Sequence, residues 1–246
     1  MLATRAIKVV TSVRVKRRPD IFWTPLRQRD GLVVVLTIVT GAIDAIGLLR
    51  LGGVFTSVMT GNMVLLGVAV GKHDAAIAFH TGVAFVAYVT GSYLGAHVAG
   101  HADGENHLWP RPIVNALGIE LAILVIFGTW WEVVGAQPST SVAYCLLALN
   151  AVALGVQSSA VLRFGISGLS TTYLTGTLTQ FIAGFTKRHE PIQLRSLLIL
   201  LALIGGAAAG ASTALEAPRF APLVPIGALA IVVVGGWAFF HRDTTN

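Results

Sequence analysis

Charge is scarce in this chain, and its scarcity decides the class of protein. Only 11% of the 246 residues are Asp, Glu, Lys or Arg, while 54% are hydrophobic. A soluble domain carries about twice that charged fraction. The mean hydropathy is +0.76, and the apolar residues come in runs of about 20 rather than in amphipathic periods, which is typical of transmembrane helices. The sequence therefore predicts an all-α integral membrane protein in contact with the lipid bilayer.

Cysteine and the common catalytic motifs are also nearly or wholly missing. The single Cys145 lies within an apolar run, which excludes a disulfide framework or a cysteine metal site within one chain. The sequence has no G-x-x-x-x-G-K-S/T loop and no G-x-S-x-G, H-E-x-x-H or C-x-x-C motif. His97 and His101 have a metal-ligand spacing, but they lie where an apolar run meets a polar loop, and we predict no metal there. We expect no enzyme, no ATP-driven pump and no cofactor.

Positive charge is concentrated before the first apolar run. Eight of the 17 Lys and Arg precede residue 32. Such a cluster holds an N-terminus in the cytoplasm, and its position argues against nucleic acid as the partner behind the net charge of +6. We treat residues 1–31 as a basic cytoplasmic segment, which either rests on anionic head groups or stays a disordered tail.

Eight apolar segments follow, and the second and sixth are the shortest and most polar. We therefore expect a helical bundle of six to eight transmembrane segments, with residues 32–135 and 136–241 as two repeats. With eight crossings, 13 Lys and Arg lie on the side of the N-terminus and four lie on the other side. Four crossings per repeat favour two halves that run in the same direction, whereas an odd number per repeat would invert one half relative to the other. The segments are residues 32–50, 54–71, 75–99, 113–134, 141–162, 168–186, 194–215 and 221–241.

Two similar hydroxyl-rich stretches, which we call the Thr-Gly elements, mark the repeat. Residues 56–62 read T-S-V-M-T-G-N, and residues 171–177, which lie 115 positions later, read T-T-Y-L-T-G-T. A G-x-x-x-G spacing at residues 91–95 likewise returns at residues 206–210. Such glycine pairs favour close helix contacts, either within one chain or between copies in a homo-oligomer.

Paired polar interruptions of apolar helices are the usual sequence sign of a transporter site. If the two elements face each other in the membrane interior, their hydroxyls, glycines and amide would line a polar cleft for an ion or small solute. The alternative is that the same residues serve helix packing alone. The predicted substrate-binding residues are Thr56, Thr60, Gly61, Asn62, Thr171, Thr175, Gly176 and Thr177, with Asp44, Arg50 and Arg163 setting charge and coupling.

The ionisable residues inside the apolar segments have open roles. Asp44 is either half of a buried ion pair, for which Arg163 is better placed than Arg50 of the same helix, or a proton or substrate site. Arg50 and Arg163 occupy matching places in the two repeats, 113 residues apart, and the same spacing pairs Asp44 with Gln157. The two arginines either extend to the membrane surface or capture an anionic solute. Further candidates for proton transfer, or for plain packing, are Glu120, His80 and Asn150.

Residues 41–55 and 59–62, together with residues 169–177, resemble the YoaK-type family of bacterial membrane proteins, and the similarity extends from residue 32 to about residue 240. The resemblance implies a bacterial inner membrane and about six spans, and it supplies no catalytic residues. We therefore expect a secondary transporter or permease for a small solute. The alternative is a non-transporting membrane protein that binds a partner or lipid.

Overall fold

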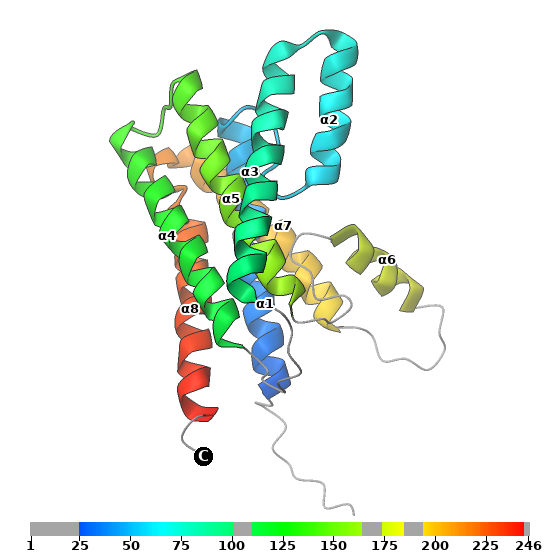
Figure 1. Cartoon of the computed structure of the whole chain (residues 1–246), viewed down its shortest axis with the longest axis vertical. Coiled ribbons are helices and arrows are strands. Elements are labelled where there is room, and N and C mark those ends of the chain that lie inside the picture. The colour runs from blue at the N-terminus through cyan, green and yellow to red at the C-terminus, as the bar shows by residue number, and fades with distance from the viewer. Residues whose placement is uncertain (1–24, 101–109, 164–173, 185–193, 244–246) are drawn as a thin grey trace, which may run out of the picture.

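The described part of the chain is helical. The computed structural model describes residues 25–100, 110–163, 174–184 and 194–243, and within these residues it contains eight α-helices, one short 3-10 helix and no strand (Figure 1). The all-α membrane bundle predicted from composition is confirmed. The elements are α1 (Pro25–Arg50), α2 (Met59–Lys72), α3 (Ala75–Ala99), α4 (Arg111–Val133), α5 (Thr140–Leu162), α6 (Leu174–Gly184), α7 (Leu194–Glu216), η1 (Pro218–Phe220) and α8 (Leu223–Asp243).

Six of the described helices are long and apolar enough to cross a membrane: α1, α3, α4, α5, α7 and α8. At a rise of about 1.5 Å per residue, the 14 residues of α2 extend about 21 Å and the 11 residues of α6 about 17 Å, less than the hydrocarbon thickness of about 30 Å. Six spanning helices lie within the range of six to eight predicted from the sequence. Three spanning helices in each half would give the two halves opposite directions, which is the arrangement that the sequence assigned to an odd number of crossings per repeat.

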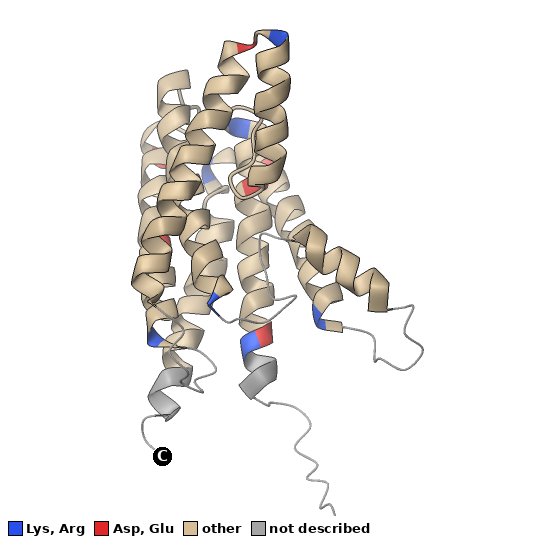
Figure 2. Ribbon diagram, turned by 45° about the vertical axis from the view of Figure 1, so that its right-hand side comes forward, with Lys and Arg blue, Asp and Glu red and all other residues tan. Residues whose placement is uncertain are grey.

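The helix between α1 and α3 ends in a tight turn. His73 follows α2 in the left-handed conformation, with φ 56°, and Asp74 begins α3 by accepting a hydrogen bond from the Ile77 N–H at 3.1 Å. The resulting α2–α3 hairpin turns at the end of the molecule opposite to the start of α1 and to the C-terminus (Figure 1). Figure 2 shows that many of the charged residues lie at the two ends of the bundle, although a few lie between them.

The closest helix contacts join one half of the chain to the other. α1 packs most extensively on α7 and then on α8, and α5 packs most extensively on α3 and then on α4. A methyl group on Gly206 would lie 2.3 Å from the Ile38 carbonyl oxygen, and one on Gly91 would lie 2.1 Å from the Val152 carbonyl oxygen. Glycine is needed at both crossings because a side chain would collide with backbone. The close contacts predicted from the glycine spacing therefore form within one chain.

Two further glycines make similar close contacts in the two halves of the chain. A methyl group on Gly41 of α1 would lie 2.3 Å from the nearest backbone atom of α7, and one on Gly155 of α5 would lie 2.4 Å from the nearest backbone atom of α3. These equivalent glycines are 114 residues apart, whereas the match of the two arginines gave 113. If the halves are repeats, this offset pairs Asp44 of α1 with Ser158 of α5 instead of Gln157.

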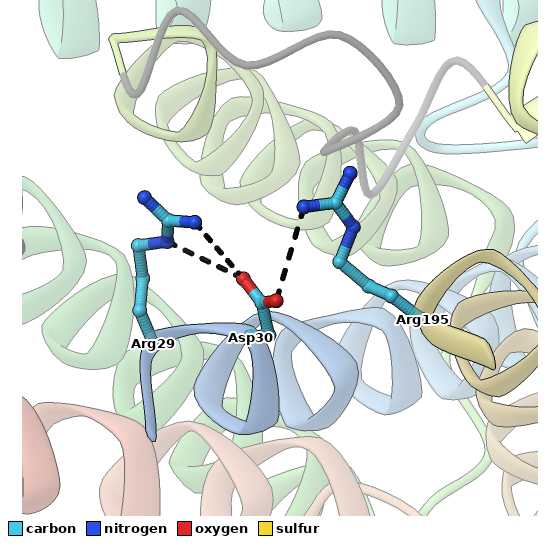
Figure 3. A network of polar contacts seen from close by, with 3 residues as sticks. All are labelled: Arg29, Asp30 and Arg195. Carbon is cyan, nitrogen blue, oxygen red and sulfur yellow. Dashed lines mark hydrogen bonds and ion pairs between the residues drawn. The ribbon is translucent and has the colours of Figure 1, made fainter. Parts of the chain in front are cut away.

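Polar contacts tie the helices together near both ends of the bundle. Trp131, which is fully buried in α4, donates a hydrogen bond from Nε1 to the Pro218 carbonyl at 2.8 Å. Asp30 joins α1 to α7, because its Oδ1 is 3.1 Å from Nη2 of Arg29 and its Oδ2 is 3.8 Å from Nη1 of Arg195 (Figure 3). Apolar side chains of α1, α4, α5 and α8 fill the interior between these contacts.

Candidate functional site

The chain turns back on itself after α1. Residues 51–58, which we call the re-entrant segment, are not helical. Gly52 and Gly53 have φ of 106° and 74°, a conformation that glycine adopts without strain. A methyl group on Gly52 would also lie 2.0 Å from the His80 ring, and one on Gly47 would lie 3.2 Å from the Val54 carbonyl oxygen. The re-entrant segment therefore runs between α3 and the last turns of α1.

Asp44 accepts four hydrogen bonds from the re-entrant segment. Its Oδ1 accepts the N–H and the hydroxyl of Thr56, both at 2.8 Å, and the N–H of Ser57 at 2.9 Å, while its Oδ2 contacts the Ser57 hydroxyl. The side chain is 7% exposed. It lies six residues before the end of α1, about 9 Å along the helix axis. Non-helical backbone is thus drawn back to the depth of a helical span, where donors compensate the buried carboxylate.

Asn62, in the first turn of α2, holds the same segment from its other side. Its Oδ1 accepts the Phe55 N–H at 3.1 Å, and its Nδ2 donates to the Phe55 carbonyl at 2.6 Å. The Asn62 side chain is fully buried. An amide that pairs with one backbone unit in both directions satisfies groups that would otherwise be lost to the helix. Asn62 therefore positions the re-entrant segment and has little amide capacity left for a solute.

The two Thr-Gly elements do not face each other over the described residues. α2 packs on α3 and α6 packs on α7, and Figure 1 shows the two short helices apart. Thr60 of the first element is exposed and Gly61 is half-buried. In the second element Thr175 and Gly176 are exposed, Thr177 is buried, and Thr171 lies outside the described residues. The prediction of a cleft between the two elements is wrong, because α1 and α5 meet at the centre of the bundle and α2 and α6 do not.

Neither predicted arginine partner reaches Asp44. Arg163 donates a hydrogen bond from Nη2 to the Ala96 carbonyl at 3.0 Å, near the end of α3. Arg50 is half-buried, and its buried Nε has no hydrogen-bond partner among the described residues. The expected pair of Asp44 with Arg163 does not form, since hydroxyl and backbone donors take its place. Arg50 is the last residue of α1, whereas Arg163 lies just beyond α5.

A polar contact joins α1 to α5 at the centre of the bundle. Gln157 donates from Nε2 to the Thr40 hydroxyl at 2.8 Å and to the Leu36 carbonyl at 3.4 Å. Thr40 lies one turn before Asp44 on α1, and all three polar side chains are buried. The sequence reasoning missed this link. The only signal for it was two hydroxyl residues, Thr37 and Thr40, within the first apolar run.

The histidines that the sequence raised have local partners. His80 lies with Nδ1 2.8 Å from the Ala76 carbonyl oxygen, and its ring packs on Tyr144 with centroids 4.4 Å apart. His97 is exposed and stacks with Tyr93, while residue 101 lies outside the described ranges. Over those ranges, no group of three or more His, Cys, Asp or Glu side chains is placed to hold a metal ion.

Comparisons with known proteins identify a family and a relative whose descriptions state no function. Residues 32–235 match a family described as "Protein of unknown function (DUF1275)". The chain is 35% identical over 203 residues to the UPF0700 transmembrane protein YoaK of Bacillus subtilis (strain 168), an alignment that covers 80% of this chain and 88% of that protein. No solved structure matches the chain. The resemblance drawn from the motifs is confirmed, and residues 1–31 lie outside the family match.

Proposed function

This chain belongs to the DUF1275 family, a family of proteins of unknown function, and we propose that it acts as a secondary transporter or permease for a small solute. The observation that carries the proposal is the re-entrant segment, which Asp44 holds at the depth of a helical span through Thr56 and Ser57. In membranes, non-helical backbone is tolerated where it is buried in protein or lines a cavity. Broken segments of this kind form the substrate sites of many secondary transporters.

The arrangement of the two halves supports the same proposal. Each half contributes three spanning helices and one short helix, and Gly41 and Gly155 make equivalent contacts in the two halves. We infer that the halves are inverted repeats, on which many secondary transporters are built. α1 and α5 then lie beside the pseudo-two-fold axis, and the buried contact between Gln157 and Thr40 crosses it.

In the proposed transport cycle, Asp44 holds the re-entrant segment closed until a solute binds. Its four hydrogen bonds hold residues 51–58 against α1. A solute that offers its own donor groups to Asp44 takes the place of Thr56 and Ser57, and this exchange releases the re-entrant segment and opens the path on that side. The proposed site therefore centres on Asp44 and the first residues of the Thr-Gly element, with Asn62 positioning the segment.

The charge distribution gives the proposed orientation. With six crossings, the side of the N-terminus carries 14 of the 17 Lys and Arg and the other side carries Arg50, Lys72 and Arg219. The bias is stronger than the 13 to four found for eight crossings. By the positive-inside rule we place both termini in the cytoplasm of a bacterial cell.

Flux measurements test the proposal directly. The purified full-length protein in liposomes is expected to take up at least one member of a panel of radiolabelled amino acids, sugars and organic ions with saturable kinetics. Asp44→Asn puts an amide donor where the carboxylate accepts four donors, so uptake should fall about tenfold or more, because a hydrogen bond to a charged group contributes about 1.5–3 kcal/mol. Thr56→Val removes one of the four and should reduce uptake less.

A matched threonine variant is the control for these measurements. Thr90 of α3 is exposed, and its hydroxyl donates to the Val86 carbonyl of the same helix. Thr90→Val should leave uptake unchanged, while Thr56→Val lowers it. Equal uptake by wild type, Asp44→Asn and Thr56→Val would remove Asp44 from the site. No uptake of any solute by correctly folded protein would favour the alternative, in which the protein binds a partner or lipid without transport.

A further inference from the structure

A second acid lies inside the bundle, away from the re-entrant segment. Glu120 is the tenth residue of the 23-residue α4, which places it about 14 Å along the helix and close to the middle of the span. The side chain is 0% exposed. Neither of its carboxyl oxygens has a hydrogen-bond partner among the described residues. A carboxyl group at this depth is costly to retain and is a functional candidate by default.

The surroundings of Glu120 are apolar. Leu117 and Leu124, one turn before and after it on α4, are fully buried in the same hydrophobic cluster as Leu154 of α5 and Leu229 of α8. α4 packs on α5, α8 and α3. No described residue of these helices forms an ion pair or hydrogen bond with Glu120. Their ionisable residues are Tyr144 and Cys145 of α5, His80, Tyr88, Tyr93 and His97 of α3, and residues 241–243 at the end of α8, with Arg111 and Glu132 near the two ends of α4 itself.

A buried amide without partners lies on the neighbouring helix. Asn150 of α5 is 0% exposed, and neither its oxygen nor its nitrogen has a partner among the described residues. α5 packs more extensively on α4 than does any other described helix. Asn150 precedes Gln157 by seven residues, so both lie on the face of α5 that meets α1. Unpaired polar groups therefore occur on two adjacent helices of the interior, where each is expensive.

We propose that Glu120 is a proton-binding residue of the bundle interior and supplies the coupling proton of the transport cycle. The coupling part rests on the proposed function, whereas proton binding does not. A proton needs one oxygen, while metal cations in proteins take about four to eight ligands. Among the described residues of α4 and of the helices packed on it, Glu120 is the only acid away from the helix ends. The two interior acids also differ in the donors around them. Asp44 meets four donors, which suits an anion, and Glu120 meets none, which suits the neutral acid.

Infrared spectroscopy of the purified full-length protein tests proton binding without a substrate. At neutral pH, wild type should show the carbonyl stretch of a protonated carboxyl group in an apolar environment. Glu120→Gln, which keeps the shape of the neutral acid, should lose that band. Glu132→Gln, an exposed position on the same helix, should keep it. A band unchanged in Glu120→Gln, or its absence from wild type at neutral pH, would overturn the proposal.

A second measurement needs no variant, in case Glu120→Gln fails to fold. Dicyclohexylcarbodiimide is an apolar reagent that modifies protonated carboxyl groups within membranes. Applied to wild type, it should label the peptide that contains Glu120, and labelling should fall as the pH rises. Labelling confined to other acidic residues would contradict proton binding at Glu120.

Uptake under an imposed pH gradient tests the coupling. Wild type should accumulate solute inside the liposomes when the imposed proton gradient is directed inward. Glu120→Gln should exchange solute across the membrane without responding to that proton gradient. An equal response in both proteins would overturn coupling through Glu120. A Glu120-dependent infrared band in a protein that transports nothing would defeat the proposed function and leave the proton site in place.

Discussion

The crossing of α1 and α7 offers a sharp test of the fold because two adjacent glycines differ completely in their surroundings. A methyl group on Gly206 would lie 2.3 Å from the Ile38 carbonyl oxygen, 2.7 Å from its Cα and 2.9 Å from its carbonyl carbon. A methyl group on Gly205 would meet nothing within 4 Å. Both positions are inside α7, so either alanine gains up to about 1 kcal/mol in helix propensity. Gly205→Ala is thus a control for Gly206→Ala in every respect except the contact.

The expected loss of stability in Gly206→Ala follows from the distance between the added methyl group and the Ile38 backbone. Ordinary van der Waals contact begins at 3.4 Å, so the methyl group on residue 206 must recede by about 1.1 Å from the Ile38 oxygen. Only backbone faces it, and no side chain can rotate away. A gap of 0.5–1 Å already forfeits about a quarter to a half of each dispersion contact along the crossing. Overpacking of this kind costs about 1–3 kcal/mol, which outweighs the gain in propensity.

Thermal unfolding of the detergent-solubilised protein, followed by circular dichroism at one scan rate, checks the comparison. Gly205→Ala should unfold at the wild-type temperature or above it, and Gly206→Ala should unfold several degrees below. If Gly206→Ala is as stable as Gly205→Ala, then α1 and α7 do not cross at Gly206. The packing of the first half of the chain on the second half along α1 and α7 would then be wrong.

Two further predictions concern the polar contacts near the ends of the bundle. Trp131→Phe removes the donor to the η1 turn and leaves a space at a fully buried position. It should therefore lower the free energy of unfolding by at least about 1 kcal/mol. Trp130→Phe, at the half-buried neighbouring position, should have a smaller effect in the same unfolding assay. Asp30→Asn weakens two part-exposed ion pairs, one with Arg29 of the same helix and one with Arg195 of α7. We expect the free energy of unfolding to change by no more than about 1 kcal/mol, and by less in high salt. A larger loss would mean that these pairs are more important than their exposure indicates.

The membrane class and most of the helices could be predicted from the sequence because lipid requires long apolar runs. The segment expected at residues 75–99 coincides with α3, and that at residues 194–215 ends one residue before α7 does. The segment expected at residues 54–71 was placed less well, since α2 begins only at Met59. Val54 to Val58 are compatible with a helix in composition. They stay non-helical because Asp44, from another helix, bonds their backbone, and such a tertiary contact leaves no local pattern.

The same limit applies to the partners of the polar residues. The first Thr-Gly element lies at non-helical backbone, where Thr56 bonds Asp44 and Asn62 bonds Phe55. The recurrence of the Thr-Gly elements did not show which helices those residues would meet. Opposite charges suggested Arg163 as the partner of Asp44, yet two backbone N–H groups and two hydroxyls satisfy the carboxylate. Backbone donors are present at almost every residue, so no sequence pattern distinguishes the ones that are used.

If the halves are the inverted repeats proposed above, they share a scaffold and differ in charge. Both interior acids, Asp44 and Glu120, belong to the first half. In the second half, α5 has Ser158 in the place of Asp44, and residues 223–240 of α8 contain no acid at all. An exact inverted repeat would offer equivalent charged sites to the two sides of the membrane. Here both interior acids are confined to one half, so a solute or proton that engages them meets two sides that are structurally related but chemically different.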